Sequence, residues 1–214
     1  MKILKVPFIG GLEAMTPEER EISMELHGAK ASVDSVNWPG EWPYCPSVHV
    51  TTARSLSHLF IHYHVRGLDL RARALEYNGP VWEDSCCEFF ISDPKDGTYY
   101  NFEMNCIGTL LAAKRKSRTD CRHFDASVLD NVIRYSSLQQ KRYDIGDKMF
   151  SWEVAMGIPF SMIGLDGNAL PGKIRANFFK CADKSAHPHF LSWNPIDVPS
   201  PDFHRPDFFG ELEF

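Results

Sequence analysis

The chain has 214 residues, of which 43% are hydrophobic and 13% aromatic, and its formal net charge is −5. This length suits one domain with a sizeable core, and residues 1–214 are treated as a single domain. Basic residues are interspersed with acidic ones and form no stripe that would neutralise phosphates, so no nucleic-acid partner is expected. No apolar run approaches the length needed to span a bilayer, so no membrane partner is expected either.

The first 30 residues predict an N-terminal arm or one short helix ahead of the main domain. The segment TPEEREISMEL begins with the cap-like Thr16, has Pro17 in its first turn and carries acidic residues early, as helix starts do. The apolar run before it is broken by Lys5 and Pro7, and no small-residue cleavage site of a signal peptide follows. As it stands, the sequence predicts a cytoplasmic protein, with export left open.

From residue 47 onwards, short apolar segments alternate with turns rich in Pro and Gly. Two hairpins are expected, one from 47–55 and 58–67, the other from 86–92 and 98–105 around the turn DPKDG. Six to seven later segments bring the strand count to about ten, and PFSMIG at 159–164 is expected to form one helical turn. This pattern predicts an all-β fold, an antiparallel β-sandwich of the immunoglobulin or jelly-roll type with one or two short helices.

The segment YYNFEMN, residues 99–105, alternates between two kinds of side chain. A strand directs successive side chains to opposite faces of its sheet. The even residues are therefore predicted to lie in the core, and the odd residues are predicted to form a polar face. The core residues are Tyr100, Phe102 and Met104, and the polar candidates are Asn101, Glu103 and Asn105.

Two tryptophans and a further carboxylate complete the candidate site. Trp82 stands just before the expected strand 86–92, which contains Glu88, and Trp193 ends a late strand. Indole rings stack on the C–H faces of sugars, whereas amides and carboxylates hydrogen-bond to sugar hydroxyls. The combination indicates a sugar-binding surface with Asn101, Glu103 and Asn105 as its floor and the two indoles as its walls.

Five motifs together resemble the family 9 carbohydrate-binding modules and their stand-alone relatives, over roughly residues 30–214. They are VWEDSCCEFFISD, YYNFEMNCIGTLLAAKR, RANFFKCAD, HFLSWNPI and PDFHRPDFFGELEF. The resemblance implies a β-sandwich related to DOMON domains and non-catalytic binding of a sugar or of a glycan chain end. It implies a carbohydrate ligand, xylan among those of the family, and association with a glycoside hydrolase, because well-known members are appended to xylanases.

By this resemblance, Trp82 and Trp193 match the two tryptophans that sandwich the sugar, and Glu88 matches a hydroxyl-binding acid. Asn101 or Glu103 falls where the family places polar ligands on the next strand. The family's amide three residues before its second tryptophan is Phe190 here, and Asn177 or Lys180 is the proposed replacement. The ending FHRPDFFGELEF is typical of the stand-alone branch.

Two other functions remain open at this stage. A glycoside hydrolase needs two carboxylates about 5 to 9.5 Å apart, and Glu88 with Glu103 on paired strands would meet that requirement. Haem binding, known in the wider sandwich group, would need an axial His or Met facing a pocket. Met104 is expected to face the core, and no haem-attachment motif is present.

Metal ligands are left unassigned. His62-x-His64 and His187-x-His189 would each share one strand face, but no third ligand stands at a convincing spacing, so hydrogen-bonded or surface histidines are expected. The six cysteines match no zinc pattern and are expected to be reduced thiols, mostly in the core.

No cofactor is assigned. The resemblance leaves room for a structural calcium ion bound by oxygen ligands. The loop acids Asp84, Asp93 and Asp96 form no recognisable calcium loop, and turn formation accounts for Asp93 and Asp96.

Overall fold

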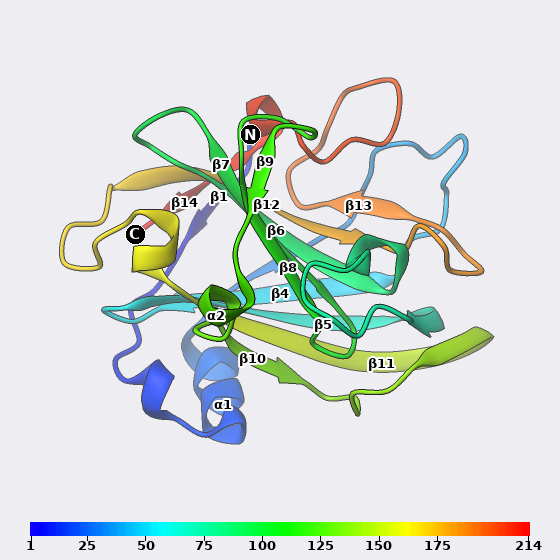
Figure 1. The fold of residues 1–214 in the computed structure, drawn as a ribbon, viewed down its shortest axis with the longest axis horizontal. Helices are drawn as coiled ribbons and strands as arrows, with labels where there is room; N and C mark the ends of the chain where they lie inside the picture. The colour runs from blue at the N-terminus through cyan, green and yellow to red at the C-terminus, as the bar shows by residue number, and fades with distance from the viewer.

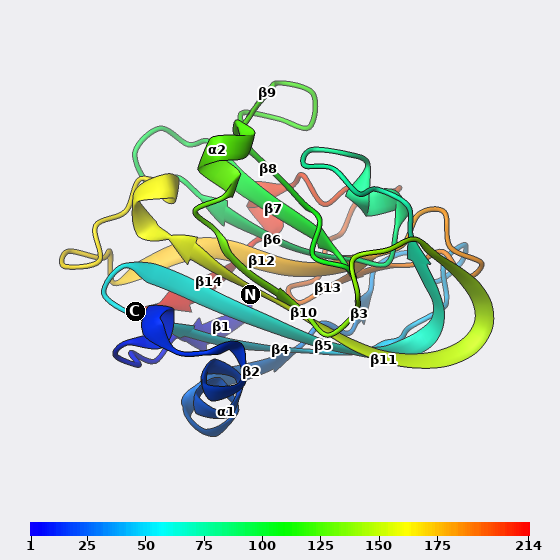
Figure 2. The same ribbon diagram turned by 60° about the horizontal axis from the view of Figure 1, so that its bottom comes forward.

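Alternating apolar residues along long strands build two β-sheets that pack face to face in the computed structural model, which describes residues 1–214. Figure 2 shows the larger sheet above the smaller one, with helix α1 (Pro17–His27) beneath the smaller sheet. In Figure 1 the strands of the two sheets cross steeply, as two twisted sheets can when they pack. The predicted β-sandwich is therefore confirmed.

The larger sheet, called sheet A here, has nine strands. Its order is β1 (Ile3–Lys5), β14 (Gly210–Glu213), β12 (Lys173–Cys181), β6 (Cys86–Ser92), β7 (Tyr99–Asn105), β8 (Leu110–Arg115) and β9 (Cys121–His123), with β13 (Phe190–Ser192) on β12 and β3 (Ser35–Val36) on β13. All of its pairs are antiparallel except β1 with β14, which is parallel. The predicted antiparallel arrangement is thus confirmed, with this one parallel pair at the edge of the sheet.

The smaller sheet, called sheet B here, has five strands. Its order is β10 (Ile133–Ser136), β11 (Tyr143–Pro159), β5 (His58–Ala72), β4 (Ser47–Arg54) and β2 (Ala29–Ser32). The long strands β5 and β11 pair along almost their whole length, with one irregularity between Ile145 and Met149. Beyond it, their far ends curve up towards sheet A (Figure 2). Such bulges bend strands and increase their twist.

The main core lies between the two sheets. From sheet A it receives the even residues of β7, Tyr100, Phe102 and Met104, as the alternation predicted. From sheet B it receives the odd residues of β5, including Ile61 and Tyr63. Consequently the odd residues of β7 and the even residues of β5 from His58 to Arg66 point to the outer faces of the sandwich.

A second apolar cluster covers the outer face of sheet A. Trp38, from the Pro-rich segment between β3 and β4, packs against Phe190 and Phe203 with ring centroids 6.4 Å from each. Phe203 in turn stacks on Phe179 of β12 at 4.4 Å. All seven residues of β7 are buried as a result, so the odd face is not the open polar surface that alternation alone suggests.

The helical predictions are confirmed. Helix α1 begins with a capping box, in which Thr16 and Glu19 exchange side-chain and backbone hydrogen bonds. The remaining helical segments are short: α2 (Ala126–Leu129) and the 3₁₀ turns η1 (Leu12–Ala14), η2 (Val81–Glu83), η3 (Phe160–Ile163) and η4 (Pro206–Phe208). No helix has the length and apolar character that a bilayer-crossing segment requires. The structure has fourteen strands, whereas about ten were predicted. The difference arises because strands of two to four residues are too short to show an alternating pattern in the sequence.

Candidate functional site

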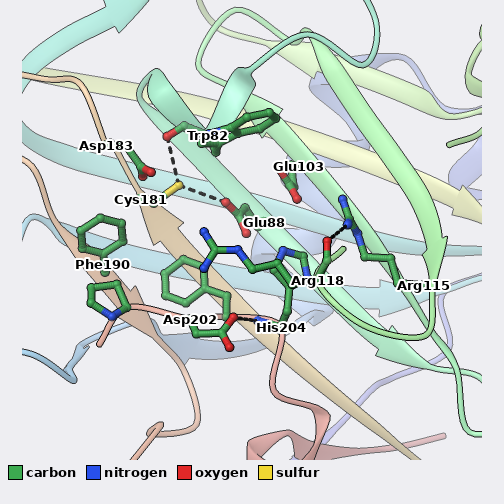
Figure 3. Close-up of a pocket in the computed structure, with 12 residues that line it drawn as sticks. Trp82, Glu88, Glu103, Arg115, Arg118, Cys181, Asp183, Phe190, Asp202 and His204 are labelled. Carbon is green, nitrogen blue, oxygen red and sulfur yellow. Dashed lines mark hydrogen bonds between the residues drawn. The ribbon is translucent and has the colours of Figure 1, made fainter. Parts of the chain in front are cut away.

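A pocket of about 240 Å³ opens through the loops that cover the outer face of sheet A. Strands β12, β6, β7 and β8 lie side by side beneath it, and the rim comes from η2, from the residues around β13 and from the segment before η4 (Figure 3). The lining residues are Trp82, Glu88, Glu103, Arg115, Arg118, Cys181, Asp183, Phe190, Pro201, Asp202, Phe203 and His204. Three of the predicted site residues, Trp82, Glu88 and Glu103, are therefore brought together.

The floor of the pocket is a pair of carboxyl groups. Glu88 of β6 stands directly opposite Glu103 of β7 in the antiparallel register, so the two Cβ atoms are about 5 Å apart. The two residues are 3% and 4% exposed. Burial raises the pKa of Glu103 to about 7, and burial together with the neighbouring Glu103 raises the pKa of Glu88 well above its usual range.

The pair is consequently not fully ionised near neutral pH. Two like charges on adjacent buried side chains repel each other, so one proton is retained between them. A protonated carboxyl group donates one hydrogen bond and accepts others, whereas its ionised neighbour only accepts. The floor thus offers both a donor and acceptors to a ligand hydroxyl.

Cys181, at the end of β12, holds the Glu88 carboxyl group of the neighbouring strand β6 by a hydrogen bond. Its Sγ donates to Glu88 Oε1 at 3.0 Å and lies 3.5 Å from the carbonyl oxygen of Trp82. Burial raises the pKa of the Cys181 thiol well above its usual range, so it remains a thiol. These contacts join the floor to the turn that carries Trp82.

A hydrogen-bonded chain orders the other carboxyl group. Asn101 Nδ2 donates to Glu103 Oε1 at 2.7 Å, and Asn101 Oδ1 accepts from Arg115 Nε at 2.7 Å. Arg115 also donates from Nη1 to the carbonyl oxygen of Arg118 at 2.8 Å. Asn101 is fully buried and does not line the pocket, so it positions Glu103 and Arg115 rather than contacting a ligand.

The rim combines aromatic and charged groups. The Trp82 side chain, carried by η2, is 39% exposed and projects beside the two carboxyl groups (Figure 3). Burial raises the pKa of Asp183 to about 6. Burial, with Arg115 and Arg118 nearby, lowers the pKa of His204 to about 3, so its imidazole is neutral and meets Tyr99 Oη at 3.0 Å through Nδ1.

Trp193 does not lie at the pocket. Its indole is 3% exposed and packs in the main core, edge-on to Phe178 with ring centroids 5.5 Å apart and against Gly210. The structure therefore contradicts the predicted clamp between Trp82 and Trp193. The reason is the alternation of side chains along β13. The last residue of that strand faces outward, so Trp193, which follows it, faces the core.

Asn105 and Asn177 are also fully buried and do not line the pocket. Asn105 donates to the carbonyl oxygen of Ala74 and to Asp84, and accepts from the backbone of Thr109. Asn177 donates to the carbonyl oxygen of Asn194 and accepts from the same residue's N–H at 2.8 Å. Their amides hold loops in place, which corrects their prediction as ligand contacts.

Several pocket residues were missed by sequence reasoning. Arg115 was not among the predicted site residues, yet it lines the pocket and is only 8% exposed. Its odd position on β8 was a usable signal, because the register puts Arg115 opposite Tyr99 on the outer face. Asp202, Phe203 and His204 come from a distant irregular segment, and no local pattern in the sequence connects them to β6 and β7.

The other candidate groups have structural partners. Asp93 and Asp96 both pair with Lys114 at 2.9 Å, and Asp84 accepts from the backbone of Arg73 and Ala74. Met104 is fully buried in the main core and faces no pocket, so it offers no axial ligand for haem.

The histidines of the second pair are also engaged. His187 contacts Asp69 at 2.8 Å, and His189 Nε2 lies 2.9 Å from Lys180 Nζ. Hydrogen-bonded histidines were predicted here. All six cysteines are free thiols, and Cys86, Cys87, Cys106 and Cys181 are buried, as expected of core thiols.

Comparison with known proteins relates this chain to a carbohydrate-binding family. A family model described as carbohydrate-binding family 9 matches residues 19–214. The chain is 36% identical to a proposed carbohydrate-binding protein from Bacteroides uniformis ATCC 8492, with a TM-score of 0.88 over 100% of this chain and 99% of the other. No significant match was found among curated proteins.

Two structures of a family 9 carbohydrate-binding module from Caldicellulosiruptor kristjanssonii share the fold. The complex with glucose has a TM-score of 0.55 at 10% identity, over 99% of this chain and 95% of that one. The complex with cellotriose has a TM-score of 0.60 at 11% identity, over 99% and 93%. At such identities the likeness concerns the fold alone.

Proposed function

Because the chain belongs to carbohydrate-binding family 9, we propose that the pocket above Glu88 and Glu103 binds one sugar residue, free or at the end of a glycan, and leaves it chemically unchanged. The observation that carries this proposal is the exposed indole of Trp82 beside a floor of paired carboxyl groups. An indole face takes the C–H face of a sugar ring, and the carboxyl pair takes its hydroxyls.

The size of the pocket supports a single residue as the ligand. Its volume of about 240 Å³ is below the roughly 300–1,000 Å³ of pockets that enclose drug-sized molecules. The related module from Caldicellulosiruptor kristjanssonii forms complexes with glucose and cellotriose, which makes glucose and short glucans the first ligands to test.

The polar groups are held in place before a ligand arrives. Glu103 is fixed by Asn101, and Glu88 by Cys181. Both side chains stand on strands, so little side-chain entropy remains to be lost on binding. Trp82 replaces the predicted pair of tryptophans as the single exposed indole, and Phe190 and Phe203 supply further apolar lining.

Calorimetric titration with glucose, xylose, cellobiose and xylobiose tests this function. Trp82→Ala is expected to weaken the best ligand about 30-fold, the effect of losing a contact of about 2 kcal/mol. Phe8→Ala is the matched control, because Phe8 is an exposed aromatic residue that does not line the pocket. Absence of binding across the panel, or equal affinity of wild type and Trp82→Ala, would contradict the proposal.

Glycoside hydrolysis is the second candidate, favoured by the pKa of about 7 that burial gives Glu103. A general acid in a hydrolase has a raised pKa of this kind, and a retaining enzyme has its carboxyl groups about 5 Å apart. However, Glu88 and Glu103 reach the ligand from the same floor, whereas hydrolytic carboxylates flank the scissile bond. Assays with aryl glucosides and xylosides test this: activity abolished by Glu103→Gln would establish hydrolysis and end the binding-only proposal.

A further inference from the structure

A second polar cluster lies on the outer face of sheet B, on the other side of the sandwich from the sugar pocket. His62 and His64 come from β5, and Glu153 comes from the neighbouring strand β11. In this part of β5 the odd residues, Ile61 and Tyr63 among them, fill the core, so His62 and His64 point outward. The register places Glu153 directly opposite His64 and diagonal to His62, so one carboxylate reaches both imidazoles.

The distances within this cluster match the edges of a metal coordination polyhedron. Glu153 Oε2 lies 3.2 Å from His62 Nε2, and Glu153 Oε1 lies 3.3 Å from His64 Nδ1. One ligand atom from each of the three residues lies within 4.8 Å of the others. Zinc holds its nitrogen and oxygen ligands at about 2.0–2.2 Å, which puts tetrahedral neighbours about 3.3 Å apart.

One of these ligand atoms has no hydrogen bond in the folded protein. His62 is 2% exposed, and its Nε2 has no hydrogen-bond partner, although the Glu153 carboxylate is close by. Buried polar atoms nearly always have a partner, and an exception calls for a missing water or ion. A metal ion between the three side chains would provide that partner.

The surroundings favour a cation that arrives from solvent. A groove of about 510 Å³ between α1 and sheet B leads to His64 and Glu153, whose side chains are 30% and 31% exposed. Glu21 of α1 lines the same groove and adds negative charge, whereas Glu25 there is paired with Lys30. An open groove also leaves room for water at a further coordination position.

We propose that His62, His64 and Glu153 form a binding site for a divalent transition metal such as zinc. Two imidazole nitrogens and one carboxylate oxygen suit zinc and related metals, whereas calcium and magnesium take oxygen ligands. Three protein ligands with an open fourth position is the arrangement of zinc sites that bind a water or a small anion. The metal class rests on this ligand set and is independent of the sugar pocket.

Zinc titration of the full-length protein tests the site, after any histidine tag has been cleaved off and metals have been removed with EDTA. Calorimetry is expected to give one zinc ion per chain, and zinc is expected to raise Tm because it binds the folded state. His64→Ala and Glu153→Gln are each expected to weaken zinc binding about 100-fold or more, since even indirect partners of a metal site contribute 10- to 100-fold. Both positions are partly exposed, so both variants should fold.

Glu21→Gln is the matched control, because it removes a carboxylate from the same groove outside the ligand set. It is expected to leave zinc affinity within about fivefold, the effect of one exposed charge. Cobalt in place of zinc should give the visible spectrum of a four-coordinate site without thiolate charge-transfer bands. Failure of the wild type to bind zinc would overturn the proposal. So would a thiolate spectrum, or binding that survives both His64→Ala and Glu153→Gln, since either would place the metal on cysteines such as Cys86 and Cys181.

Discussion

The outer faces of the two sheets differ in how they are covered, and that difference decides which chemistry each face can perform. On sheet A, long loops bury the strand face almost completely, and the gap that remains exposes Glu88 and Glu103 beside Trp82. On sheet B, α1 covers only part of the face, and His62, His64 and Glu153 lie beside an open groove. A polar strand face becomes a defined site where its cover is incomplete.

The largest expected effect is the difference in stability loss between a tryptophan in the core and a tryptophan on an outer face. Trp193→Ala is expected to lower the free energy of unfolding by about 3–5 kcal/mol, because the indole fills the core between Phe178 and Gly210. Trp82→Ala, with 39% of the side chain exposed, is expected to change it by about 0.5 kcal/mol or less. Urea denaturation followed by circular dichroism measures both. Similar losses in the two variants would mean that Trp82 is as much a core residue as Trp193.

The next largest effect is the change of stability with pH that the buried carboxyl groups of sheet A should cause. The folded-state pKa of Glu103, about 7, lies above the unfolded value of 4.5, so the folded state binds more protons between these values. Stability is therefore expected to fall as pH rises from about 4.5 to 7, by up to about 3 kcal/mol. The raised pKa of Glu88 acts in the same direction.

Unfolding measurements from pH 5 to 8 check this dependence. Glu103→Gln is expected to flatten the curve and to be more stable than wild type above pH 7, since it removes the buried ionisation. Glu18→Gln removes a carboxyl group from the exposed face of α1 and serves as the control. If wild-type stability instead rises over this interval, the carboxyl pair is not buried as described.

A smaller effect concerns the ordering of the pocket above Glu88 and Glu103. Arg115→Lys removes the planar guanidinium that bonds Asn101 and the Arg118 backbone at once. Sugar affinity is expected to fall about tenfold, corresponding to one lost charge-assisted hydrogen bond of about 1.5 kcal/mol. Arg66→Lys, on the exposed outer face of sheet B, is the comparison, and calorimetry with the best sugar of the panel is the measurement. If Arg66→Lys lowered sugar affinity as much as Arg115→Lys, the effect could not be attributed to the hydrogen bonds of Arg115 beneath the pocket.

The smallest expected effect is coupling between the two faces. His64→Ala is expected to leave sugar affinity within about twofold, and Trp82→Ala is expected to leave zinc affinity within about twofold, because distant sites without shared partners act additively. Calorimetric titration of each variant with both ligands measures the coupling. A tenfold change in either cross-titration would show that the core between the sheets links the two sites.

Predictability from the sequence differs sharply between these regions. The sandwich, α1 with its capping box and the core face of β7 were all predicted, because helix caps and alternation are local patterns. The resemblance to carbohydrate-binding family 9 was confirmed by the family match over residues 19–214. The site was predicted only in part: Trp82, Glu88 and Glu103 meet, whereas Trp193, Asn105 and Asn177 serve the core and the loops.

The errors at Asn105 and Asn177 share one physical reason, which differs from the strand-end alternation that places Trp193 in the core. Alternation assigns a residue to a face of a sheet but does not say what covers that face. Asn105 looked like a ligand contact because its odd position matched Glu103, yet the segment around Asp84 lies over it and accepts its hydrogen bond. Likewise no spacing in the sequence linked Glu153 to the His62-x-His64 pair, since the pairing of β5 with β11 makes that connection.

The sequence by itself determined which functional side chains are present and which face of its strand each one occupies. In YYNFEMN the amide and carboxylate side chains lie on one face and the apolar side chains on the other, and the two histidines of β5 share one face. These follow from the two-residue period of an extended chain, which needs no tertiary information. Only the tertiary structure decided that Glu88 and Glu103 share a largely buried floor, that Arg115 and His204 join them, and that Glu153 completes a trio with the histidines. Those outcomes depend on strand register and on which distant loop lies over which face, and long-range packing determines both.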